Sequence, residues 1–164
     1  MPPKHDIALG WESVGALLDD GLEKLVREHH KLVGEYKAEM PLDPDWEGYR
    51  KLELDGLMKI LAARRGERLI GYNSFLLLPG HLHYRNTAHV LGDAIFVTKS
   101  QWHTGAGAAL VERAEIDLTA MFPGRHVRIR YHDKYGQRFL DKMLLKRGYR
   151  HSEIILDKMV GGPG

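Results

Sequence analysis

The residue types that could bind or react with a ligand gather in one stretch of this sequence, residues 93–108. An acid, Asp93, precedes a short apolar run, residues 94–97, of the kind that forms a buried strand. A polar connector follows, and Gly105 and Gly107 then open a segment whose apolar residues recur at helical spacing. Free backbone N–H groups and the helix dipole favour an anion at a helix N-terminus, most often a phosphate. The stretch therefore predicts a strand, a glycine loop and a helix that together bind a phosphate group.

The glycines are needed because a Cβ atom would keep phosphate oxygens away from the backbone. We expect the phosphate to lie against six consecutive residues, His103, Thr104, Gly105, Ala106, Gly107 and Ala108.

Histidines form two further groups. His81, His83 and His89 lie just before the predicted strand, and an H-x-H pair can bind zinc. Because no third ligand follows at a familiar spacing, we favour a polar loop beside a cleft, whose imidazoles could touch a substrate, and we predict no metal site. His29 and His30 are adjacent on a predicted helix and so do not face each other. We expect one at the edge of the apolar stripe and the other in solvent.

Composition narrows the class of protein. The 164 residues suggest one domain, residues 1–160, with a disordered tail over residues 161–164. The content of 43% hydrophobic and 28% charged residues is typical of a globular protein. A net charge of +2 is too small to indicate nucleic-acid binding. The absence of cysteine excludes disulfides, thiolate metal sites and a cysteine nucleophile. No apolar run has membrane-spanning length and no leader pattern is visible, so the cytoplasm is the expected compartment.

The predicted elements follow from apolar periodicity and from turn residues. Gly66 supplies the turn of a β-hairpin, Gly71 suggests a bulge or a close backbone approach, and Asp43 with Pro44 suggests a helix start. The expected order is a short strand at 7–9, one long amphipathic helix at 14–33, a helix at 44–55, strands at 57–64, 68–78 and 90–97, the helix after the glycine loop, a strand at 126–131, a helix at 134–146, and a closing strand or hairpin at 149–160.

This order, with GDAIFV, WHTGAGAALVERAE and KMLLKRGYR in their places, resembles the GNAT superfamily of N-acetyltransferases. The resemblance implies an α/β (α+β) fold, a mixed and mostly antiparallel central sheet flanked by about four helices. In that family an Arg/Gln-x-x-Gly-x-Gly/Ala signature holds the pyrophosphate of acetyl-CoA. Gly105 and Gly107 fill its two glycine positions, and Trp102 stands where Arg or Gln is usual. Acetyl-CoA is therefore the expected co-substrate, with no metal.

The resemblance also implies a reaction, direct attack of an amine on the thioester. The family parts its fourth and fifth strands so that backbone of the fourth can pair with the pantetheine arm, which here implicates Phe96 and Val97. Asp93 is the acid nearest the expected place of a general base. A tyrosine that the family often uses as general acid is replaced by Leu144, so we consider Tyr135 for that role, with Tyr131 as the neighbouring alternative.

Several alternatives remain open at this point. The acceptor could be an amine-bearing small molecule or a peptide; we expect no nucleic-acid or membrane partner, and monomer and homodimer are both compatible with the sequence. The chain could bind acyl-CoA without turnover. A nicotinamide-dinucleotide site is disfavoured, because Leu110 occupies the place of its third glycine and the connector after Val97 is long for such a turn.

Overall fold

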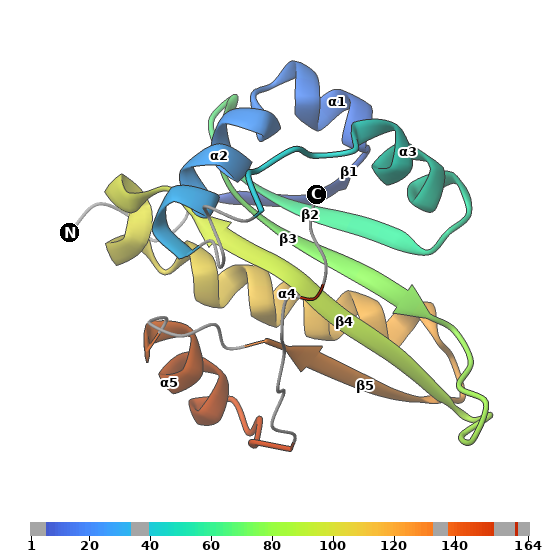
Figure 1. The fold of residues 1–164 in the computed structure, drawn as a ribbon. Coiled ribbons are helices and arrows are strands. Elements are labelled where there is room, and N and C mark those ends of the chain that lie inside the picture. The colour runs from blue at the N-terminus through green and yellow to red at the C-terminus, as the bar shows by residue number, and fades with distance from the viewer. Residues whose placement is uncertain (1–5, 34–39, 133–137, 153–159, 161–164) are drawn as a thin grey trace.

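The computed structural model describes residues 6–33, 40–132, 138–152 and 160. Five strands form one sheet in the order β1-β2-β3-β4-β5 (Figure 1). Neighbouring strands from β1 to β4 are antiparallel, and β5 runs parallel to β4. The predicted α/β class with a mostly antiparallel mixed sheet is thus confirmed. The strands are β1 (Ala8–Glu12), β2 (Met58–Arg65), β3 (Arg68–Leu78), β4 (Thr87–Val97) and β5 (His126–Tyr131).

Helices cover both faces of the sheet. The three N-terminal helices pack on one face, and the helix that follows β4 packs on the other, with the last described helix beside it (Figure 1). None of the described helices is long and apolar enough to cross a membrane. The helices are α1 (Val14–Asp19), α2 (Leu22–Val33), α3 (Trp46–Leu54), α4 (Ala106–Met121) and α5 (Arg138–Lys146), and a 3-10 turn, η1 (Lys99–Thr104), precedes α4.

Several boundaries differ from the sequence-based expectation; β1 ends at Glu12 and not at residue 9, and β4 begins at Thr87 and not at residue 90. The single helix predicted at 14–33 is wrong, because Gly21 adopts a left-handed φ of 96° and separates α1 from α2. α3 begins two residues later than expected, with the side chain of Asp45 as its N-cap. At the C-terminal end, residues 149–152 are not in a strand. Residues 153–159, Tyr135 and the tail at 161–164 lie outside the described residues.

Two close contacts shape β4. A Cβ on Gly71 would lie 2.7 Å from the carbonyl oxygen of Phe96, so the close backbone approach predicted at this glycine is confirmed. On the other side, Tyr131 of β5 packs on Gly92, where a Cβ would lie 2.4 Å from the tyrosine ring. Both glycines are required because no side chain fits between the neighbouring strands at these points.

A β-bulge in β4 lies at Asp93. Ser74 of β3 pairs with Ala94 and Phe75 pairs with Gly92, which leaves Asp93 as the extra residue. The pairing between β4 and β5 also ends at Gly92, opposite Tyr131. From Asp93 onward β4 therefore pairs with β3 and, among the described strands, with no strand on its other side.

Three tyrosines that are buried or partly buried lead to a prediction about the stability of the fold at alkaline pH. Burial raises the pKa of Tyr72, Tyr131 and Tyr149 well above the ordinary value of 10.0. In the unfolded chain these phenols ionise near pH 10, whereas in the folded chain they stay protonated. Their contribution to stability is therefore complete below pH 10 and is lost as the pH rises above it. We expect the melting temperature, followed by circular dichroism, to fall steeply above pH 10.

The matched comparison is Tyr131→Phe with Tyr84→Phe, since Tyr84 is 60% exposed. Tyr131→Phe should flatten the alkaline fall, and Tyr84→Phe should leave its slope as in the parent. Equal slopes in all three proteins would contradict the assignment.

Candidate functional site

The end of β4 presents an open backbone edge. Residues of an antiparallel strand alternate between peptide groups that face the partner strand and groups that face away. The N–H of Thr98 donates to Ile70 O at 2.8 Å, and this bond sets the alternation. The peptide groups of Phe96 consequently face β3, whereas those of Ile95 and Val97 face away from it. Beyond the bulge, a ligand that carries amide groups could pair with this edge as a further strand would.

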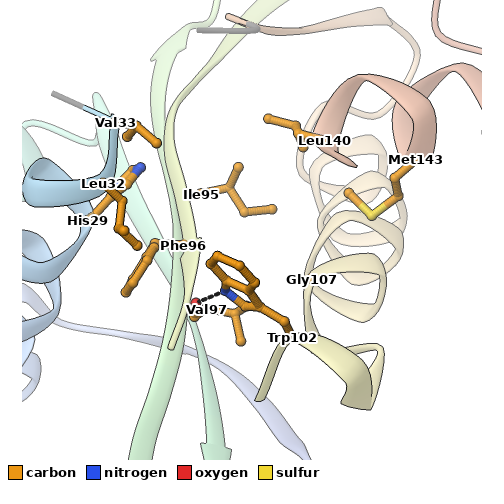
Figure 2. Close-up of a pocket in the computed structure, with 10 residues that line it drawn as sticks. All are labelled: His29, Leu32, Val33, Ile95, Phe96, Val97, Trp102, Gly107, Leu140 and Met143. Carbon is orange, nitrogen blue, oxygen red and sulfur yellow. Dashed lines mark hydrogen bonds between the residues drawn. The ribbon is translucent and has the colours of Figure 1, made fainter. Parts of the chain in front are cut away.

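A cavity of about 420 Å³ lies along this edge (Figure 2). Its walls are mostly aliphatic and aromatic, and they come from both sides of the sheet edge. The cavity therefore suits a slender ligand whose apolar parts contact the walls and whose amides contact the strand. The lining residues are His29, Leu32 and Val33 of α2, Ile95, Phe96 and Val97 of β4, Trp102 of η1, Gly107 of α4, and Leu140 and Met143 of α5.

The N-terminus of α4 is next to this cavity. Gly105 precedes the helix with a left-handed φ of 82°, no side chain caps the helix, and its first turn contains no acid. The N–H of Ala106 donates to the hydroxyl of Thr104 at 3.4 Å. The next two N–H groups, those of Gly107 and Ala108, belong to the first turn, where no intrahelical acceptor exists. The positive end of the helix dipole therefore lies beside Gly107, which lines the cavity.

The structure brings together most of the residues predicted to bind the cofactor. Phe96, Val97, Trp102 and Gly107 line the cavity. Of the others, His103, Thr104 and Gly105 form the turn that leads into α4, and Ala106 and Ala108 lie in the first turn of α4. The side chain of Ala106 is fully buried in the core, which leaves only backbone groups at that position to meet a ligand.

The peptide groups of Phe96, which was expected to pair with the pantetheine arm, face β3, and those of Ile95 face the cavity. The side chain of Phe96 stacks on His29 with ring centroids 5.0 Å apart, on the face covered by α2. Sequence reasoning missed Ile95 because the bulge fixes which peptide groups face the cavity, and the one-residue register change has no separate sequence signal.

Trp102 contacts the open edge of β4 through its indole ring. Its indole N–H donates to the carbonyl oxygen of Val97 at 2.7 Å, on the open edge of β4 (Figure 2). The ring is 53% exposed and forms part of the cavity wall. Trp102 therefore contributes an aromatic surface and also occupies one acceptor of the edge.

Substitution of Trp102 should separate these two contributions. Trp102→Ala removes the aromatic wall and should weaken CoA binding about five- to tenfold. Trp102→Phe keeps a ring and should stay within about threefold of the parent, because the ligand can use the released carbonyl of Val97. Isothermal titration measures both, with Lys99→Ala at the exposed start of η1 as control. An equal loss in the Phe and Ala variants would instead assign the effect to the indole N–H.

A second cavity, of about 190 Å³, lies on the face of the sheet covered by α2 and α3. His29 and Val33 line both cavities, so the two spaces adjoin at the C-terminal half of α2. The residues that line the second cavity are Leu22, Val26, His29, His30, Val33, Leu42, Trp46, Tyr49, Ile60, Tyr72, Ser74, Asp93 and Ala94.

Asp93 lies in the lining of this second cavity, where the bulge places it. Burial raises the pKa of Tyr49, and the negative charge of Asp93 raises it further. Burial likewise raises the pKa of Tyr72, with smaller contributions from Tyr49 and Asp93. The hydroxyl of Tyr72 lies 3.0 Å from Nδ1 of His29. A carboxylate, two neutral phenols and an imidazole thus meet in one small space.

Neither Leu144, which occupies the position of the family's tyrosine, nor Tyr131 lies in the lining of the two cavities. Leu144 is buried against Val111 and Leu140, so it serves packing between α4 and α5. The hydroxyl of Tyr131 accepts a hydrogen bond from Nδ2 of Asn73 at 2.8 Å, and Tyr131 lines neither cavity. Tyr135 is outside the described residues.

The histidines fall differently from the expectation. His81, His83 and His89 gather near the β3–β4 connection, where the rings of His81 and His89 stack at 4.5 Å, and none of them lines either cavity. Within the described residues, no group of three or more His, Asp or Glu side chains could hold a metal ion. His29, by contrast, is buried and lines both cavities. The place of His29 in the apolar stripe that contains Leu25 indicates that the side chain is buried, but it does not indicate that the side chain lines a cavity.

Comparison with known proteins agrees with this geometry. No family model matches the sequence, and no curated protein matches it. Solved structures do match over nearly the whole chain. An aminoglycoside acetyltransferase from an uncultured soil metagenomic sample has a TM-score of 0.73 at 17% identity, covering 94% of this chain and 99% of that one. Another aminoglycoside acetyltransferase from such a sample, in complex with sisomicin, has a TM-score of 0.70 at 12% identity, covering 95% and 96%.

A ribosomal-protein-alanine N-acetyltransferase from Brucella melitensis biovar Abortus 2308 has a TM-score of 0.65 at 14% identity, covering 95% of this chain and 99% of that one. The chain therefore has the GNAT fold, the fold of GNAT-type acetyltransferases. At such low identity the likeness concerns the fold alone.

Proposed function

We propose that this protein is an N-acetyltransferase that transfers the acetyl group of acetyl-CoA to an amine by direct attack. The observation that carries the proposal is the open edge of β4. It lies between the uncapped N-terminus of α4 and a second cavity that contains the carboxylate of Asp93. This arrangement offers one place for an anion, one for an amide-bearing arm and one for an amine, in that order along β4.

The residues present fit acetyl-CoA. The backbone N–H groups of Gly107 and Ala108 would hold the pyrophosphate, and the carbonyl oxygen of Ile95 and the peptide N–H of Val97 would pair with the pantetheine amides. Leu140 and Met143 of α5 would cover the arm from the opposite side. When bound, acetyl-CoA supplies an activated thioester carbonyl.

Asp93 would receive the proton of the acceptor. An amine is largely ammonium at neutral pH and cannot attack until it loses a proton. A carboxylate in the second cavity, which adjoins the first cavity at His29, could accept it directly or through one water. The peptide N–H of Ile95 faces the cavity of about 420 Å³, here called the cofactor cavity, and could donate to the oxygen that becomes negative during attack. As the amide forms, the attacking nitrogen loses its second proton, and the departing thiolate takes up one proton, so the free thiol of CoA leaves.

A second candidate function is acyl-CoA binding without turnover. The observation that favours it is Leu144, which packs in the core at the place where the family often has a catalytic tyrosine. It requires the same CoA site and predicts no acetyl transfer.

Two measurements test the proposal. Isothermal titration should show binding of acetyl-CoA and CoA, and no comparable binding of NAD. Thiol release from acetyl-CoA should then accelerate when amines are added. CoA binding without thiol release for any amine favours the binding module, and NAD binding without CoA binding overturns both.

A further inference from the structure

The second cavity has the chemistry of a site for a small cation with an apolar body. Among the described residues in its lining, Asp93 is the only acid, and none is lysine or arginine. The remaining walls are aliphatic and aromatic, with the hydroxyls of Tyr49, Tyr72 and Ser74 and the imidazoles of His29 and His30 among them. A bound ligand would therefore meet one negative charge and several apolar surfaces.

Two aromatic side chains of α3 shape the wall of this cavity. The rings of Trp46 and Tyr49 lie 5.1 Å apart and are tilted by 59°. An ammonium group is attracted to the face of an aromatic ring, most strongly to that of tryptophan. Tyr49 is also close enough to Asp93 for the carboxylate to affect its ionisation. The aromatic wall and the single charge consequently lie beside each other in the lining of the cavity.

The size of the cavity restricts the ligand further. Its volume of about 190 Å³ is less than half that of the cofactor cavity, and it is below the range of roughly 300–1,000 Å³ that holds drug-sized ligands. A polycationic ring system would bring several ammonium groups into a cavity whose described lining offers one carboxylate, Asp93, so the additional charges would have no acidic partner there. Buried polar groups without partners cost free energy, so such a ligand is disfavoured.

From this arrangement we infer that the acceptor is a small primary monoamine with an aryl or alkyl body. Its ammonium group lies against Asp93, and its apolar body packs against Trp46 and Tyr49. The inference rests on the proposed function for the direction of acetyl transfer, and it separates this protein from the aminoglycoside acetyltransferases that share its fold.

Binding of probe amines in the absence of acetyl-CoA tests the inference independently of transfer. We choose 2-phenylethylamine and its uncharged analogue 2-phenylethanol, both titrated into the full chain. The amine should bind more tightly than the alcohol. Asp93→Asn should weaken amine binding about 10- to 100-fold and leave alcohol binding within twofold, because only the amine uses the charge. Trp46→Leu should weaken amine binding about fivefold through loss of the aromatic face.

One control variant accompanies these. Glu47→Gln removes an exposed acid next to Trp46 that does not line the cavity, and it should bind like the parent. Circular dichroism and melting temperatures establish that each variant is folded, and Trp46→Leu still tests the site if Asp93→Asn does not fold.

Acetyl transfer gives the second readout. The value of kcat/KM should be at least tenfold higher for 2-phenylethylamine than for kanamycin, spermidine or a short peptide with a free N-terminus. Preference for any of these three, or equal amine and alcohol affinities, overturns the inference and leaves the proposed function intact. If CoA does not bind and 2-phenylethylamine still binds through Asp93, the proposed function fails and the amine site stands.

Discussion

Asp93→Asn should lower kcat for acetyl transfer by about 10²–10⁴-fold, the usual contribution of a positioned general base. The substitution keeps the size of the side chain and removes its basicity, so the ammonium of the acceptor keeps its proton. Because Asp93 lies in the second cavity and not in the lining of the cofactor cavity, CoA affinity should stay within about twofold. Steady-state kinetics and isothermal titration provide the two values.

The pH profile distinguishes a general base from a structural role for Asp93. At high pH more of the acceptor is already the free amine, and the variant should recover part of its rate there. A variant that is only misfolded would not recover with pH. Turnover of Asp93→Asn within a few-fold of the parent would place the base elsewhere, and His29, which lines both cavities, would be the next residue to replace.

Gly107→Glu should abolish measurable CoA binding. A Cβ at Gly107 would meet no atom within 4 Å, so the new side chain fits the fold and projects into open space beside the cofactor cavity. Its carboxylate would then compete with the pyrophosphate for the N-terminus of α4. Gly105 is a poorer probe, because its φ of 82° strains any other residue and would mix a folding effect with a binding effect.

The matched control is Gly15→Glu. Gly15 also lies in a helix, α1, has open space around its Cβ position and lines neither cavity. It should bind CoA like the parent and have a similar melting temperature. Unchanged CoA binding by Gly107→Glu would mean that the phosphate lies away from the start of α4.

The strand, glycine loop and helix of residues 93–108 could be predicted because each depends on local chemistry. An apolar run, a left-handed glycine and an apolar period of 3.6 residues are readable without tertiary contacts. Gly71 was similarly readable, since an isolated glycine in a strand indicates close approach of another backbone. The break between α1 and α2 was missed because the apolar stripe continues across Gly21.

The second cavity could not be predicted, because it is assembled from distant parts of the chain. Trp46 of α3 packs against the core cluster on that face of the sheet and also lines the cavity. His29 belongs to an apolar stripe and looked structural for that reason. Only the packing of α2 and α3 over the end of β4 shows that these residues surround Asp93.

The short pairing between β4 and β5 has a thermodynamic consequence for the unliganded protein. β5 pairs with β4 over residues 87–92 of β4, and among the described residues Leu140 and Leu144 of α5 pack with Val111 of α4. A ligand in the cofactor cavity would contact β4 on one side and α5 on the other, so it would add contacts between these elements to those that the described residues make. Binding to the folded state alone adds about 2.7 kcal/mol to the free energy of unfolding at a ligand concentration 100 times Kd. This increase in the free energy should be largest for local opening of β5 and α5. The opening of these two elements would therefore indicate whether the cofactor cavity is occupied.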